Sequence, residues 1–268
     1  MASLNNTLIF KECLHTLEHR SRVTEHSTSN VIEAVGDNDY STFSDIRDYN
    51  INIADGSEPS RVDAVFVKSK GVTRYNGIPT GGSGTGWTQR QIRETIVNYE
   101  GDAVDTTVDG FQHDLFLLPS HFTATSVRLQ FTGSNIEIYE IMLLELGIEI
   151  DANESDFLEI QPVQVDRTGG VDTSDSGQLS RGPGDSNARH RRNTDVTIQV
   201  IPGVSLMDNV DAFLFWLEDN PHFVIVEEFT RFPKWCYPAV NGSTRIEVRY
   251  LTDFKPNGYA VPFRILER

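Results

Sequence analysis

The feature of this chain that most constrains its fold is a succession of short segments in which apolar and polar residues alternate. Clusters of Gly, Asp, Asn and Ser separate these segments. Alternation with a period of two is the pattern of a half-buried strand, and turn-forming residues between such runs favour antiparallel connections. In the first 150 residues the segments are TLIFKECLH, YNINIA, RVDAVFVKS, DLFLLP, TSVRLQFTG and NIEIYEIMLLELG. They predict a mainly β fold of the sandwich or jelly-roll type.

The alternation also predicts which side chains face the core. One face of each strand should be apolar, and the intervening residues should face solvent or a second layer. The residues expected in the core are Val62, Ala64, Phe66, Val127, Leu129, Phe131, Ile136, Ile138 and Ile141. The residues expected on the other face are Asp63, Val65, Val67, Arg128 and Gln130.

A change of character after residue 150 divides the chain. The polar joint DANESD follows Ile150, and 268 residues exceed the usual size of one domain. We therefore expect two domains, at 1–152 and 153–268. The second should contain strands, a long polar loop at 168–193 and one flanking helix at 206–220, where apolar residues recur at helical spacing until Asn220-Pro221 ends it.

The charge balance excludes several classes of function. The chain has 39 acidic and 23 basic residues, a formal net charge of -16. This charge repels DNA phosphates and anionic lipid headgroups, so we expect no nucleic-acid sequence recognition. The sequence shows neither an export signal nor a run of about 18 apolar residues, so we expect no membrane span. Two cysteines, Cys13 and Cys236, indicate folding in a reducing cytoplasm.

No residue pattern predicts catalysis. The seven histidines are scattered, and only His15 and His19 have the spacing of a helical metal pair, without the glutamate of an HExxH motif. No nucleophile elbow is present, and the acidic residues at 102–114 are typical of surface loops. We therefore predict that the protein is not an enzyme and has no catalytic residues.

A calcium site is the one cofactor hypothesis that the residues offer. In GDNDYSTF, Asp37, Asn38, Asp39 and Thr42 could present the oxygen ligands that calcium prefers. The alternative is a plain Asx turn without metal. No other cofactor is expected.

Two further features suggest contacts. Trp87 follows the glycine-rich loop at 78–86 and is either an exposed ligand-binding aromatic or a residue that closes a core edge. The segment 88–100 fits either a helix or a strand.

The polar 168–193 loop carries basic residues that we interpret as assembly contacts for acidic neighbours, with phosphate binding as the alternative. These residues are Arg181, Arg189, His190, Arg191 and Arg192.

The first half resembles a discoidin (F5/8 type C) domain, a galactose-binding-like jelly roll. The similarity lies in AVGDNDYSTF at 34–43, YNINIADGSEPSRVDAVFVKS, and VRLQFTGSNIEIYEIMLLE. It implies a structural calcium site at Asp37, Asn38, Asp39 and Thr42, with Glu145 nearby, and ligands that range from sugars to proteins. Phe43 or Ser44 stands where that family usually has Trp, and the family's disulfide is missing.

The second half, around WLEDNPHFVIVEEFTRFPKWCYPAV, resembles tail-tube-like and distal tail ring proteins of bacteriophages. This resemblance implies a β-sandwich or barrel with one flanking helix and a long loop that packs on the adjoining ring. It also implies a homo-oligomer, usually a hexameric ring, in the tail or baseplate of a virion. Its partners would be other tail or baseplate proteins, and the first half would bind either these neighbours or a host cell-surface glycan. The competing hypothesis is a free-standing carbohydrate-binding protein.

Overall fold

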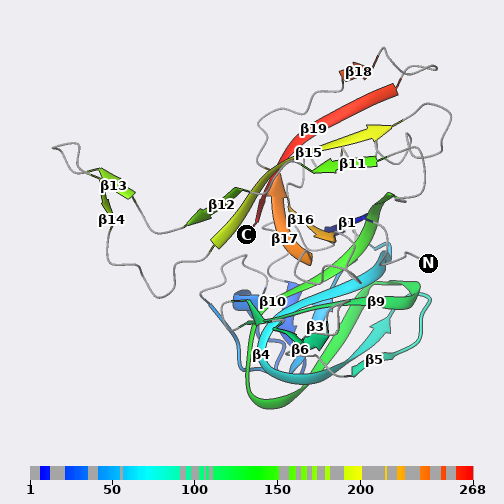
Figure 1. The fold of residues 1–268 in the computed structure, drawn as a ribbon. Coiled ribbons are helices and arrows are strands. Elements are labelled where there is room, and N and C mark those ends of the chain that lie inside the picture. Colours follow the sequence, from blue (N-terminus) through cyan, green and yellow to red (C-terminus); the bar gives the residue numbers. More distant parts are fainter. Residues whose placement is uncertain are drawn as a thin grey trace. The chain divides into compact units, whose positions relative to one another are not determined.

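The computed structural model shows a mainly β protein, as the alternation predicts (Figure 1). The chain forms two compact units. Unit 1 comprises Met1–Glu149 and His222–Tyr237, and unit 2 comprises Ile150–Pro221 and Pro238–Arg268. The chain therefore returns to unit 1 after its first passage through unit 2. The structure describes residues 7–12, 22–35, 42–54, 57–90, 95–97, 103–105, 107–108, 111–150, 157–160, 164–167, 171–173, 179–181, 190–200, 215, 222–226, 236–241, 249–251 and 258–267.

Unit 1 is built on one antiparallel sheet with the strand order β16-β1-β10-β4-β9-β8. In addition, β3 pairs with β10 and β2, β5 pairs with β4, and β6 and β7 form a separate pair. In the segment 88–100, for which the sequence left helix or strand open, the described residues are strands: the last three residues of β5 and all of β6. The elements are β1 (Thr7–Glu12), β2 (Val23–Glu25), the 3-10 turn η2 (Glu33–Val35), β3 (Asp48–Asn52), β4 (Ser60–Thr80), β5 (Trp87–Arg90), β6 (Thr95–Val97), β7 (Ala103–Asp105), β8 (Thr107–Val108), β9 (Phe111–Ala124), β10 (Ser126–Ile150) and β16 (His222–Val226).

The long strands β4 and β10 pair along most of their length and curve together (Figure 1). Their register shifts on both sides of Gly133, and Gly71 and Asn135 there have φ angles of 68° and 49°. Bulges of this kind bend a strand and increase its twist. The bend curves this pair of strands over the first core of unit 1.

The first core of unit 1 contains Val127, Leu129 and Phe131, together with Ile136, Ile138 and Ile141. Each of these side chains is at most 4% exposed. The sequence predicts all six: the period of two holds from Val127 to Phe131 and from Ile136 to Ile138, and a register shift between Ile138 and Glu140 returns Ile141 to the same core. The alternation prediction is therefore confirmed for this strand.

For β4 the same prediction is partly wrong. Val62 lies in the first core as expected, but Ala64 and Phe66 belong to a second core, and Val65 and Val67 join the first. The register of β4 against β9 shifts between Val62 and Ala64, and this irregularity resets the alternation. A local shift of register cannot be read from the spacing of apolar residues alone.

The second core lies on the opposite face of the central sheet. It is formed by one or two residues from each of five neighbouring strands, and β16 contributes Val224, which is directly opposite Phe10 in the register. A sheet that is apolar on both faces must be covered on both. Its buried members are Leu8, Phe10, Ala64, Phe66, Leu115, Met142, Leu144 and Val224.

Unit 2 is also antiparallel, with β15 and β19 paired at its centre. Both β11 and β12 pair with β15, β18 pairs with β19, and residues 239–241 of β17 pair with β19. The elements are β11 (Phe157–Ile160), β12 (Gln164–Arg167), β13 (Val171–Thr173), β14 (Leu179–Arg181), β15 (His190–Val200), β17 (Cys236–Asn241), β18 (Arg249–Leu251) and β19 (Gly258–Glu267).

The structure describes only part of the predicted loop at 168–193 and of the predicted helix at 206–220. Within the 168–193 segment, β13 and β14 form a hairpin of their own, and β15 begins at His190. Of the predicted helix at 206–220, Phe215 alone is described; it is helical and 73% exposed. Within the described ranges, no helix has the length and apolarity to cross a membrane.

Candidate functional site

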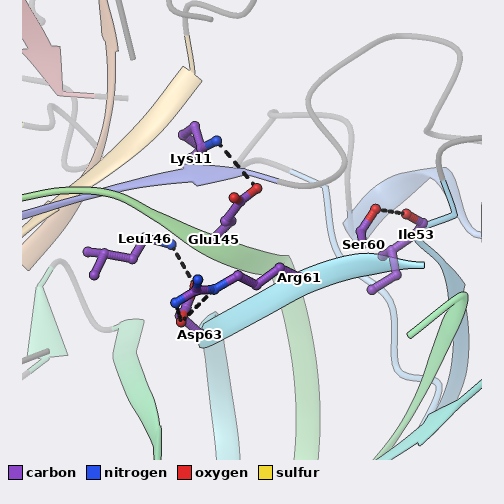
Figure 2. A network of polar contacts seen from close by, with 7 residues as sticks. All are labelled: Lys11, Ile53, Ser60, Arg61, Asp63, Glu145 and Leu146. Carbon is purple, nitrogen blue, oxygen red and sulfur yellow. Dashed lines mark hydrogen bonds and ion pairs between the residues drawn. The ribbon is translucent and has the colours of Figure 1, made fainter. Parts of the chain in front are cut away.

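The predicted calcium ligands lie where the structure describes little. Asp37, Asn38 and Asp39 fall outside the described residues, while Thr42 is described and half-buried. Glu145, the fifth acidic or polar residue that the discoidin resemblance brings in, forms an ion pair with Lys11 at 3.3 Å (Figure 2). Among the residues that the structure describes, no group of three or more potential metal ligands is found. The calcium site stays a prediction.

The polar contacts beside Glu145 join β1, β4 and β10 (Figure 2). Asp63 accepts hydrogen bonds from the Arg61 guanidinium, at 2.8 Å from Nη2, and from the backbone N–H of Leu146 at 2.9 Å. Ser60 donates to the carbonyl of Ile53 in the same view. Asp63 therefore fastens the irregular start of β4 to the closing strand.

Trp87, for which the sequence leaves two roles open, lies at the edge of the first core. Its indole meets the ring of Tyr75 edge-on, with centroids 5.6 Å apart, and meets Phe116 at 5.4 Å. A Cβ atom on Gly77 would lie 2.1 Å from the indole, so glycine leaves the space that this ring occupies. The buried Nε1 has no hydrogen-bond partner among the described residues. The indole face is thus used for packing within unit 1.

The glycine-rich loop before Trp87 is attached to the end of β9. Ser83 forms a backbone bridge with Thr123, and their hydroxyl groups lie 3.0 Å apart. A Cβ atom on Gly82 would lie 2.0 Å from the carbonyl oxygen of Thr123. Glycine is needed here for close backbone approach, and no phosphate-binding role follows from it.

A partly buried polar cluster connects three neighbouring strands of unit 1. The Tyr75 hydroxyl donates to Oδ2 of Asp114 at 2.6 Å, and the Gln89 amide donates to Oδ1 at 3.2 Å. Burial raises the pKa of Asp114, while both hydrogen bonds act in the opposite direction. Burial likewise holds the pKa of Tyr75 well above its usual value. Because both donors meet the carboxylate, the cluster fastens β4, β5 and β9 together.

The predicted basic contacts are distributed over two elements of unit 2. Arg181 ends β14 and lies opposite Val171 in the register. His190, Arg191 and Arg192 begin β15 and pair with β12, where Asp166 is directly opposite Arg191. Arg189 lies outside the described residues.

The structure adds a site that the sequence did not single out. Phe43 is 50% exposed, and its ring lies 5.5 Å from the ring of Tyr139, which is 5% exposed. Lys70 places Nζ 5.3 Å above the Tyr139 ring and pairs with Glu137 at 3.6 Å. We call these four residues, Phe43, Lys70, Glu137 and Tyr139, the aromatic rim. The available sequence signal was the end of the discoidin-like motif, where the resemblance places Phe43 or Ser44 at the position of a Trp.

The electrostatics of the aromatic rim are locally balanced. Tyr139 donates a hydrogen bond to Glu137, and Lys70 lies directly opposite Glu137 in the register of β4 and β10. Hydrogen bonding with Tyr139 and the charge of Glu137 raise the pKa of Lys70. The rim therefore offers one half-exposed apolar ring beside a fixed donor and a fixed acceptor, which suits binding more than bond cleavage.

Comparisons with known proteins do not assign a family. No protein-family model matches the chain, and no curated protein matches it. The chain is similar to a solved structure titled "CpGH89CBM32-6 produced by Clostridium perfringens", with 16% sequence identity and a TM-score of 0.33. The alignment covers 50% of this chain and 98% of that one. A likeness of this strength does not identify a shared fold or a shared ligand.

Proposed function

We propose that this chain is a non-catalytic structural and binding component of a bacteriophage tail or baseplate. In this proposal unit 2 joins copies of the chain into a ring, and unit 1 contacts neighbouring tail proteins or a host glycan. The single observation that carries it is the hairpin of β13 and β14, which pairs with no other described strand.

A two-stranded hairpin is marginally stable by itself in water. Its flanking residues at 168–170, 174–178 and 182–189 are mostly Gly, Ser, Asp and other polar or charged types, which cannot bury a core. An insertion of this length in a compact domain is usually functional, and a partner surface would supply the missing contacts. This favours an assembly contact over a solvent-exposed loop for residues 168–189, which we call the arm.

Charge supports the same interpretation. The arm carries Arg181 and leads into the basic start of β15, whereas the whole chain has a formal net charge of -16. Arginines form strong paired hydrogen bonds with carboxylates, so an acidic neighbouring copy is a suitable partner. Repetition of such a head-to-tail contact closes into a ring when the rotation permits, and the resemblance to tail-tube proteins favours six copies.

The direct test is the size of the assembly. Deletion of residues 170–187 leaves a four-residue connection, Thr168-Gly169-Ala188-Arg189, between the paired ends of β12 and β15. Four residues are a common hairpin length, so the sheet of unit 2 should survive. We expect the wild type to form rings by light scattering and electron microscopy, and the deletion variant to be a folded monomer.

A second variant keeps the length of the arm but scrambles residues 171–181, which removes the β13 and β14 pattern without changing composition. The proposal predicts loss of rings in this variant as well. A monomeric wild type, both alone and with tail extract, would contradict the proposal, and so would rings that persist without the arm.

A second candidate function is that of a free-standing carbohydrate-binding protein. The observation that favours it is the aromatic rim of unit 1, with its half-exposed Phe43 beside Lys70 and Glu137. This alternative predicts saccharide affinity in a chain that stays monomeric. The two functions are therefore separated by measuring mass and saccharide binding on the same sample.

A further inference from the structure

We infer that the aromatic rim is a saccharide site, and that Phe43 stacks on the apolar face of a neutral pyranose ring. This inference deepens the binding role proposed for unit 1, because it names the ligand class and the residues. It does not depend on whether unit 2 forms a ring.

The first argument is the rigidity of the exposed ring's support. Phe43 lies against Tyr139, whose ring is almost fully buried and whose hydroxyl is held by Glu137. The next residue, Ser44, exchanges two backbone hydrogen bonds with Ile138, at 2.9 and 2.8 Å. The backbone on both sides of the ring contact is thus fixed before a ligand arrives, which reduces the entropic cost of binding.

The second argument is the pairing of donor and acceptor. Side chains of Lys70 and Glu137 are 42% and 34% exposed, so both can reach a ligand while they remain paired with one another. Sugar hydroxyl groups both donate and accept hydrogen bonds, and they need partners of both kinds. The bulge residues Ser134 and Asn135, also exposed, add further polar groups at the same bend.

The third argument concerns the size and charge of the ligand. A stable protein interface buries roughly 800 Å² per partner around an apolar centre, whereas the rim offers a single half-exposed aromatic ring among charged side chains. The exposed face of the single Phe43 ring matches the apolar face of one pyranose. Because Lys70 is already neutralised by Glu137 and the chain carries a formal charge of -16, a neutral sugar fits better than an acidic one.

The experiment titrates the full chain with methyl glycosides of glucose, galactose and N-acetylglucosamine, and with sialyllactose as an acidic probe, using calorimetry and saturation-transfer NMR. We expect binding of at least one neutral glycoside and weaker binding of sialyllactose. Phe43→Ala should reduce the affinity about tenfold, which corresponds to about 1.4 kcal/mol. Glu137→Gln should reduce it by a smaller factor, because the acceptor is weakened while the ring remains.

Ile78→Ala is the matched control, since Ile78 is a 41% exposed apolar residue near the C-terminal end of β4, away from Lys70. It should leave saccharide binding unchanged, and thermal unfolding should verify that each variant is folded. Absence of binding to every probe would overturn the inference, as would a Phe43→Ala variant that binds like the wild type. Rings without saccharide affinity would refute this site alone, whereas saccharide binding by a monomer would refute the ring.

Discussion

A Cβ atom on Gly133 would lie 1.9 Å from the carbonyl oxygen of Gly71, across the bend of the paired strands β4 and β10. A Cβ atom on Gly71 would in turn lie 2.2 Å from the carbonyl oxygen of Ser134, and Gly71 has a φ of +68°. The two backbones thus approach more closely than any side chain permits. The aromatic rim lies at this bend, so its geometry depends on the two glycines.

Gly133→Ala is therefore expected to destabilise the protein by about 1 to 3 kcal/mol, because rigid backbone must move to admit the methyl group. Gly86→Ala is the control: its Cβ would meet its nearest neighbour at 3.3 Å in an exposed loop, and its effect should stay within about 0.5 kcal/mol. Urea unfolding measures both. Equal effects would refute the close-approach argument.

Because of Asp114, the free energy of unfolding should fall as the pH rises. Burial raises its pKa above the usual 3.8, so the unfolded chain ionises first, and stability falls between that value and the raised pKa. Asp114→Asn retains an acceptor for Tyr75 and should lose less stability than the wild type as the pH rises above 3.8. Asp114→Ala leaves the Tyr75 and Gln89 donors without their acceptor and should cost about 1 to 3 kcal/mol. Denaturant unfolding across this pH range distinguishes the two variants.

Asp48 should behave in the opposite sense. Its carboxylate accepts two hydrogen bonds from the Arg128 guanidinium, at 2.9 and 2.6 Å, and these lower its pKa. A lowered pKa contributes stability above the unfolded value of 3.8, and this contribution is lost as the pH falls through the lowered pKa. Asp48→Asn should therefore flatten the acid limb of the stability curve. Acid titration followed by circular dichroism checks this.

The strand β16 should be essential to unit 1. Val224 is fully buried opposite Phe10, so Val224→Ala should cost about 2 kcal/mol, and a fragment of residues 1–152 should lose cooperative unfolding because it lacks this strand. Phe215→Ala, at a 73% exposed position, is the control. Thermal unfolding and binding of a hydrophobic dye report the result. A fragment that melts like the full chain would contradict the prediction.

Calcium binding tests the discoidin-like motif. If Asp37 and Asp39 ligate calcium, added calcium should raise the Tm and a chelator should reverse the change, because a ligand that binds only the folded state stabilises it. A double variant, Asp37→Asn with Asp39→Asn, should remove the response. A wild-type Tm that is indifferent to calcium would favour the Asx turn.

The sequence could predict the β class and much of the core, because alternation with a period of two is a local property of the chain. This is why Val127, Leu129 and Phe131 are found where expected. Phe43 could not be identified in the same way, since its significance depends on Tyr139 and Lys70, which are distant in sequence and become neighbours only through strand pairing. Trp87 illustrates the same limit, because residue type alone did not separate packing from exposure.

By itself, the sequence determined the strand-rich class, the polar joint near residue 150 and the basic residues of the 168–193 loop, because each of these depends only on local composition and spacing. Tertiary structure alone decided that β16 returns to pair with β1 and that the alternation of β4 resets after Val62. It also decided that Gly71 meets Gly133. These features arise from contacts between residues far apart in the chain, and those contacts form only when the strands pair in this order and register.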